Sequence, residues 1–156
     1  DVMGVNLPPE PNQELNDSTI EGIDANQNGI RDDVELAIFK EYPNSAKTRA
    51  VLLQYAKALQ TGMILEIINE ETVTEAIKEE DRADICTADT LVPRKSPESE
   101  RTYSDLEKIN TYINFVKKLQ LNTEERKEFR TNFYKKLRSY KSLPNECDID
   151  FSLLPD

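Results

Sequence analysis

Segment 24–35 carries oxygen-bearing side chains at alternate positions, a pattern that suits the binding of a hard divalent cation. Calcium prefers about six to eight oxygen ligands, and a twelve-residue loop presents them from its first, third, fifth, seventh, ninth and twelfth positions. In this sequence those positions are Asp24, Asn26, Asn28, Ile30, Asp32 and Glu35. We therefore predict a calcium-binding loop with these residues as its ligands.

Each position of this loop has a defined task. Ile30 contributes its backbone carbonyl, and Asp32 binds directly or through a water molecule. Glu35, one turn into the following helix, supplies both carboxylate oxygens, while Gly29 allows the sharp turn before Ile30. The alternative is an ordinary turn rich in asparagine and glycine, whose acidic residues stabilise the start of a helix.

The two cysteines offer a second, covalent kind of chemistry. Cys86 and Cys147 lie far apart in the sequence, and neither belongs to a C-x-x-C motif. An even number outside such motifs favours a disulfide, which would indicate an oxidising compartment. The alternative is two separate thiols, with Cys86 buried and Cys147 near a loose end.

Composition excludes several classes of function. The chain of 156 residues contains no histidine, which excludes histidine-dependent nucleophiles and histidine-ligated metals. Its net charge of −10 opposes nucleic acid or an anionic membrane as the main partner. No stretch approaches the roughly 18 consecutive apolar residues of a membrane-spanning helix, so we predict no transmembrane segment.

The elements that position these residues are predicted to be helices. Residues 1–14, with Pro8, Pro9 and Pro11, are expected to form an extended leader or tether, and residues 15–156 a single helical domain. Helix starts are indicated by residue pairs or single caps at Ser18 and Glu21, Ser45, Thr72 and Glu75, Ser104 and Glu107, and Asn122 and Glu125. Pro43 and Pro144 indicate helix ends.

Apolar residues between these signals repeat at helical spacing. One face comprises Val51, Leu52, Tyr55, Leu59, Met63 and Ile67, and another comprises Leu106, Ile109, Ile113 and Val116. The last predicted helix carries Phe129, Phe133, Leu137 and Tyr140. The alternation of apolar and polar residues typical of strands is nearly absent. We predict an all-α bundle of four or five helices with one EF-hand-like loop.

Part of the chain resembles a known group of proteins. The segment from Gly22 through Glu35, followed by Tyr42-Pro43 and by residues 45–49 and 54–58, is similar to uncharacterised exported proteins of Gram-negative bacteria that carry one EF-hand-like loop. The similarity covers about residues 20–60 and implies no known activity. It implies a periplasmic or secreted protein. Since the sequence starts at Asp1, we expect that any signal peptide has been removed, and a lipid-anchored form is compatible with this.

The loop departs from a paired EF-hand at its eighth position. Arg31 stands where a paired loop carries an aliphatic residue, and the sequence has no second loop. A calmodulin-type switch is therefore not expected.

These observations favour a non-enzymatic exported domain with a structural calcium ion that binds a protein or cell-envelope partner. One alternative is a carboxylate-dependent hydrolase of envelope polymers, which would need an acidic cleft and a carboxyl group with a strongly raised pKa. Another is a calcium-responsive regulator, in which calcium would rearrange the helices. The sequence specifies neither the partner nor the oligomeric state.

Overall fold

The computed structural model describes residues 6–65, 70–136 and 147–156. Within these ranges all regular structure is helical and no strand occurs, which confirms the predicted all-α class. The elements are α1 (Gln13–Asp17), α2 (Asp32–Glu41), α3 (Ala46–Ile64), α4 (Glu70–Leu91), α5 (Tyr103–Gln120), α6 (Glu124–Tyr134) and the 3-10 turn η1 (Phe151–Leu153). None of the described helices is long and apolar enough to span a bilayer.

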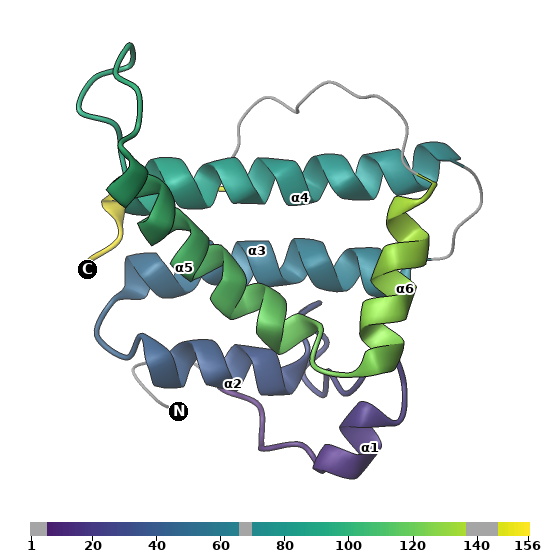
Figure 1. Ribbon diagram of the computed structural model, residues 1–156. Coiled ribbons are helices and arrows are strands. Elements are labelled where there is room, and N and C mark those ends of the chain that lie inside the picture. Colours follow the sequence, from purple (N-terminus) through teal and green to yellow (C-terminus); the bar gives the residue numbers. More distant parts are fainter. Residues whose placement is uncertain (1–5, 66–69, 137–146) are drawn as a thin grey trace.

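Helix α3 lies at the centre of the bundle. It contacts α2 on one side and α4 on the other, and α5 crosses this layer diagonally (Figure 1). Helix α6 lies across one end of the layer, where α1 and the loop before α2 are also found. We call this the loop end. The C-terminal segment lies at the opposite end, beside the start of α3 and the end of α4.

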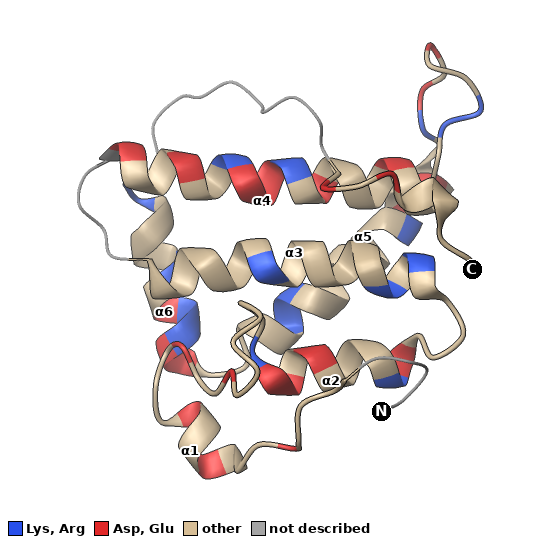
Figure 2. Cartoon of the chain, turned by 180° about the vertical axis from the view of Figure 1, so that it is seen from behind, with Lys and Arg blue, Asp and Glu red and all other residues tan. Residues whose placement is uncertain are grey.

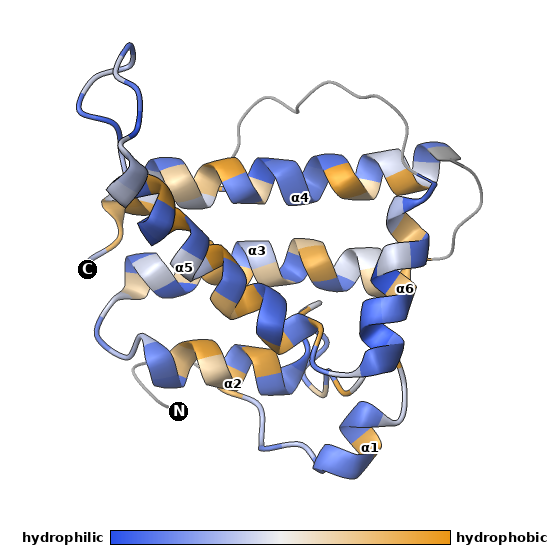
Figure 3. Cartoon of the chain, viewed as in Figure 1, coloured by the Kyte–Doolittle hydropathy of each residue, from blue (hydrophilic) through white to orange (hydrophobic). Residues whose placement is uncertain are grey.

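The central position of α3 follows from its broad apolar face. The predicted residues of this face that lie in the described ranges are all buried, namely Val51, Leu52, Tyr55, Leu59 and Met63. Ile67 lies outside those ranges. The main core adds Val34 and Ile38 from α2, Ala83 from α4 and Ile109, Ile113 and Val116 from α5. Figure 3 shows these hydrophobic bands along the helices and a hydrophilic connection between α4 and α5.

A smaller core joins α4 to α6. Phe133 of α6 packs against Val73, Ala76 and Ile77 of α4, and Phe129 lies at its edge. The predicted apolar residues Leu137 and Tyr140 lie outside the described residues, as does Pro144. The charged residues of helix α4 are mostly acidic, with Lys78 and Arg82 between them (Figure 2).

Two predicted helix boundaries are confirmed. Ser45 caps α3, because its Oγ accepts a hydrogen bond from the backbone N of Thr48 at 3.1 Å. Helix α2 ends at Glu41, shortly before Pro43. Arg49 stabilises this end by donating hydrogen bonds to the carbonyls of Tyr42 and Pro43.

Other predicted starts were wrong. The capping box of α5 is Thr102 with Asp105, two residues before the predicted Ser104 and Glu107, and Leu106 is 49% exposed. Ser18 ends α1 instead of starting a helix, because Asn12 caps that helix through the backbone N of Leu15.

Three further boundaries differ from the prediction. The cap of α6 is Thr123, whereas the predicted Asn122 accepts hydrogen bonds from Arg126 and Arg31. Helix α4 begins at Glu70, before the predicted Thr72, and it continues to Leu91. Within the predicted leader, Gln13 already belongs to α1.

Candidate metal centre

The predicted calcium loop is a closed turn between residue 23 and the first turn of α2. The backbone N of Asp32 donates to the carbonyl of Ile23 at 2.9 Å, which joins the two ends of the loop. Gln27 and Gly29 have positive φ angles of 54° and 84°, so the chain reverses sharply at the predicted glycine. Ile30 buries its side chain in the main core and anchors the loop there.

Asp24 organises the middle of this loop. Its Oδ1 accepts a hydrogen bond from the backbone N of Asn28 at 3.2 Å, and its Oδ2 accepts one from Gly29 at 2.9 Å. These bonds hold the backbone of the fifth and sixth positions around the carboxylate of the first.

Glu35 meets both asparagines of the predicted ligand set. The residue is only 4% exposed, and its Oε1 accepts from Asn28 Nδ2 at 2.7 Å and from Asn26 Nδ2 at 3.4 Å. The third, fifth and twelfth positions therefore converge. A cation at this point would require both amides to rotate so that their oxygens replace their nitrogens as the inward-facing atoms.

Asp32 is the most completely buried carboxylate of the loop, with 1% of its surface exposed. Its Oδ2 accepts from the backbone N of Ala25 at 2.9 Å, whereas Oδ1 is buried with no hydrogen-bond partner among the described residues. Burial raises the pKa of Asp32, and the negative charges of Asp24 and Asp33 raise it further. An unpartnered buried carboxylate oxygen is costly, and a cation would satisfy it.

The donor set of the loop is mixed. Across the described residues, histidine, cysteine, aspartate and glutamate side chains form no group of three or more that could hold a metal ion by themselves. The predicted set combines the carboxylates of Asp24, Asp32 and Glu35 with two amides and the carbonyl of Ile30. Neutral oxygens are ordinary calcium ligands, so this composition fits calcium better than a metal that prefers nitrogen or sulfur.

Arg31 explains the unusual eighth position of the loop. Its side chain is fully buried, and Nε lies 2.6 Å from Asp33 Oδ1. Its Nη1 and Nη2 donate to the carbonyls of Gln120 and Leu119 at 3.2 and 2.5 Å. These acceptors lie at the C-terminal end of α5, where helix carbonyls lack internal partners. Arg31 therefore fastens the loop to α5.

Arg126 links α6 to the N-terminal segment in the same way, through hydrogen bonds to backbone carbonyls. It is also fully buried, and it donates to the carbonyls of Asn16, Thr19 and Ile20 at 2.6, 3.1 and 3.1 Å. Its Nη1 lies 3.0 Å from Asp17 Oδ1. No local pattern predicts this role, because the acceptors in the N-terminal segment lie more than a hundred residues earlier in the chain.

Gly22 packs against the side chains of both arginines. Its φ is +65°, and a Cβ added there would lie 2.4 Å from Arg31 Cδ and 2.7 Å from Asn16 Oδ1. Asn16 is itself buried and accepts from the backbone N of Ile23 at 2.9 Å. We refer to Asn16, Gly22, Arg31 and Arg126 as the arginine hub.

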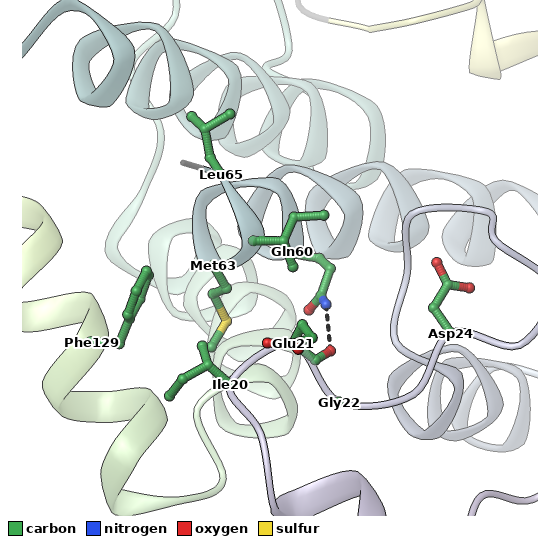
Figure 4. A pocket seen from close by; sticks show the side chains of 9 residues that line it. Ile20, Glu21, Gly22, Asp24, Gln60, Met63, Leu65 and Phe129 are labelled. Carbon is green, nitrogen blue, oxygen red and sulfur yellow. Dashed lines mark hydrogen bonds between the residues drawn. The ribbon is translucent and has the colours of Figure 1, made fainter. Parts of the chain in front are cut away.

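A pocket of about 700 Å³ lies beside the loop (Figure 4). Met63, Leu65 and Phe129 contribute apolar walls, and Asp24 lies at one side. Gln60 donates from Nε2 to the carbonyl of Glu21 at 2.8 Å, which joins α3 to the chain just before the loop.

The predicted disulfide is confirmed at the end opposite the loop. Cys86 and Cys147 are bonded, with their Cα atoms 5.2 Å apart. Phe151 packs with Val51 and Cys86, and the backbone N of Lys47 donates to the carbonyl of Pro155 at 2.9 Å. We call this the disulfide end.

The hydrolase alternative would need two cooperating carboxyl groups in one cleft. Burial raises the pKa of Asp32 and of Asp84, but Asp32 lies in the loop and Asp84 on α4. Asp84 shares a pocket with Glu80 and Asp81, but its volume of about 140 Å³ is too small for a segment of a polymer. This arrangement does not favour action on a polymer.

No protein-family model, curated protein or solved structure matches this chain. The resemblance of residues 20–60 to exported bacterial proteins therefore stays a hypothesis. The interpretation of the loop rests on the contacts described above.

Proposed function

We propose that this chain is a non-enzymatic helical domain that binds one structural calcium ion in the loop 24–35. We propose further that it is periplasmic or secreted and binds a protein or another component of the cell envelope. The observation that carries the calcium proposal is the buried carboxylate pair of the loop. Oδ1 of Asp32 is buried without a hydrogen-bond partner among the described residues. The carboxylate of Glu35 accepts hydrogen bonds from the side-chain amides of Asn26 and Asn28.

The same contacts support a structural role over a switch. A calcium switch needs a helix that changes its packing when the ion binds. Here Ile30 is buried in the main core, and Arg31 donates to the carbonyls that end α5. Binding is therefore expected to stabilise the existing arrangement.

The disulfide supports a location outside the cytoplasm. Disulfides persist mainly in oxidising compartments and are rare in reducing ones. The bond between Cys86 and Cys147 fixes the C-terminal segment to α4. An exported domain that meets variable conditions would benefit from such a link.

Thermal unfolding in calcium and in chelator tests the calcium proposal. An ion that binds only the folded state stabilises it by about 2.7 kcal/mol at a hundredfold excess over Kd. With three charged ligands, we expect a Kd of about 10⁻⁶–10⁻³ M. Millimolar calcium should raise Tm clearly. Magnesium prefers a smaller and more rigid site, so it should raise Tm by a smaller amount. Absence of both a binding heat and a Tm shift would refute the proposal.

A further inference from the structure

A second polar site lies between four helices, away from the calcium loop. It is a pocket of about 140 Å³ with charged residues of both signs on its walls. Its polar lining includes Glu80, Asp81 and Asp84 from α4, Lys117 from α5, Arg130 from α6 and Tyr55 from α3. One helix thus supplies the negative wall, and two others supply the positive one.

One part of this lining is already paired. Arg130 donates to both carboxylate oxygens of Glu80, at 2.6 and 2.7 Å, and Tyr134 donates its hydroxyl to the same carboxylate at 2.8 Å. The guanidinium of Arg130 also stacks on the ring of Tyr134, 4.3 Å from its centroid. Glu80 is only 4% exposed, so this group forms a rigid side of the pocket.

Three other groups in the lining have no hydrogen-bond or ion-pair partner among the residues that the structure describes. Tyr55 is 2% exposed, yet its hydroxyl makes no hydrogen bond with the described part of the chain. Asp84 and Lys117 interact electrostatically across the pocket, but within the described residues their side chains form neither an ion pair nor a hydrogen bond. The pocket therefore presents a hydroxyl, a carboxylate and an ammonium group that a small ligand could engage together.

The electrostatics agree with this geometry. Burial raises the pKa of Asp84, and Lys117 only partly opposes that shift. Burial also raises the pKa of Tyr55, and the negative charges of Asp84 and Glu80 add to the effect. Both groups therefore lie in a poorly solvated place where a ligand would gain strong hydrogen bonds.

We infer that this pocket binds a small zwitterion. This is either an α-amino acid with a short side chain or an amino acid in which a short carbon chain separates the ammonium group from the carboxylate. Its ammonium group would lie against Asp84 and its carboxylate against Lys117, with the hydroxyl of Tyr55 as a further partner. A simple anion would meet three acidic side chains, and a simple cation would leave Lys117 unmatched. The volume of about 140 Å³ suits a small ligand.

This inference does not depend on the calcium proposal, because the two sites share no residue. Titration of the full chain with glycine and with 4-aminobutanoate, followed by calorimetry and by amide NMR shifts, tests it. At least one of them should bind saturably, with shifts near residues 55, 84 and 117. Butylammonium and butanoate, which each carry one of the two charges, should bind at least about tenfold more weakly.

Substitutions assign the contacts. Asp84→Asn and Lys117→Gln should each raise Kd about tenfold or more, and Tyr55→Phe should raise it severalfold. Tyr55→Phe should keep the fold, because the lost hydroxyl makes no bond within the described residues. The matched control is Lys118→Gln, an exposed neighbour on α5 that should leave Kd unchanged.

Three results would overturn the inference. The first is no saturable binding of either amino acid. The second is binding of butylammonium or butanoate as tightly as the zwitterion. The third is a Kd that Asp84→Asn and Lys117→Gln leave unchanged although the variants melt like the parent.

Discussion

The loop end and the disulfide end of this bundle are held together by different chemistry. At the loop end, Arg31 and Arg126 are fully buried and donate to backbone carbonyls of α5 and of the N-terminal segment. At the disulfide end, the bond between Cys86 and Cys147 fixes the C-terminal segment. Hydrogen-bonded buried charges stabilise only while each has its partners, whereas a disulfide acts regardless of pH or metal. The loop end should therefore respond to substitution and to solution conditions, and the disulfide end to reducing agents.

The largest expected effect is at the arginine hub. Arg126→Met keeps the length of the side chain but leaves the carbonyls of Asn16, Thr19 and Ile20 without their donor. Each buried acceptor that loses its donor costs about 1–3 kcal/mol, so we expect a loss of about 3–5 kcal/mol for the three carbonyls together. Urea unfolding of the oxidised protein measures the loss. Arg94→Met, at an exposed arginine in the connection between α4 and α5, is the control and should change little. Equal losses in both variants would contradict the importance of the hub.

Reduction should act at the opposite end and independently. Loss of the disulfide is expected to lower stability by about 2–5 kcal/mol, because the unfolded chain gains conformational freedom. Tm is measured with and without reductant, each in calcium and in calcium-free buffer. Reduction should lower Tm in both buffers and leave the calcium-dependent shift in place. A shift that disappears on reduction would show that the two ends are not independent.

A pair of glycine variants separates strain in the hub from strain in the loop. Gly22→Ala would place Cβ against Arg31 and Asn16, which are packed, so we expect a loss of about 1–3 kcal/mol. Gly29→Ala also has a positive φ, but its nearest neighbour is the flexible Lys57 side chain at 3.1 Å. Urea unfolding in calcium-free buffer should therefore find Gly22→Ala the less stable of the two. The reverse order would contradict the packing described around Gly22.

The smallest expected effect is a difference in how the stability of the two ends depends on pH. Burial raises the pKa of Asp32, so without calcium the charged carboxylate lowers stability above that pKa, and this loss disappears as the pH falls toward the ordinary value of 3.8. A bound cation favours the charged form instead. The calcium-dependent rise in Tm should therefore shrink as the pH falls from about 7 to about 4. The Tm difference between oxidised and reduced protein should stay nearly constant, and parallel pH profiles would contradict this assignment.

Local signals in the sequence predicted local structure well. Ser45 was identified as the cap of α3, and the apolar face of that helix was identified from its spacing, because both depend on residues a few positions apart. The start of α5 was misplaced by two residues, since Thr102 with Asp105 and Ser104 with Glu107 have the same spacing. Only the structure of α5 shows which of these two pairs forms the capping box.

Features built from distant segments were harder to predict. The cysteine pair was predicted and confirmed, because only one intramolecular pairing of two cysteines exists. Arg31 departs visibly from the loop pattern, but nothing in the sequence near residues 119 and 120 predicts that their carbonyls accept its hydrogen bonds. The pocket formed by Tyr55, Asp84 and Lys117 was not predicted, because each residue comes from a different helix and resembles an ordinary core or surface residue.

Calcium titration of the parent protein and Glu35→Gln by calorimetry tests the central claim most directly. Glutamine keeps an oxygen that can accept from Asn28 Nδ2, but it removes the charge and the bidentate grip on calcium. The parent should bind one ion per chain, and Glu35→Gln should bind at least about tenfold more weakly, with a similar Tm in calcium-free buffer. Glu41→Gln, an exposed position on the same helix, should bind like the parent. Equal calcium affinity in the parent and Glu35→Gln, or no binding heat in the parent, would contradict the account.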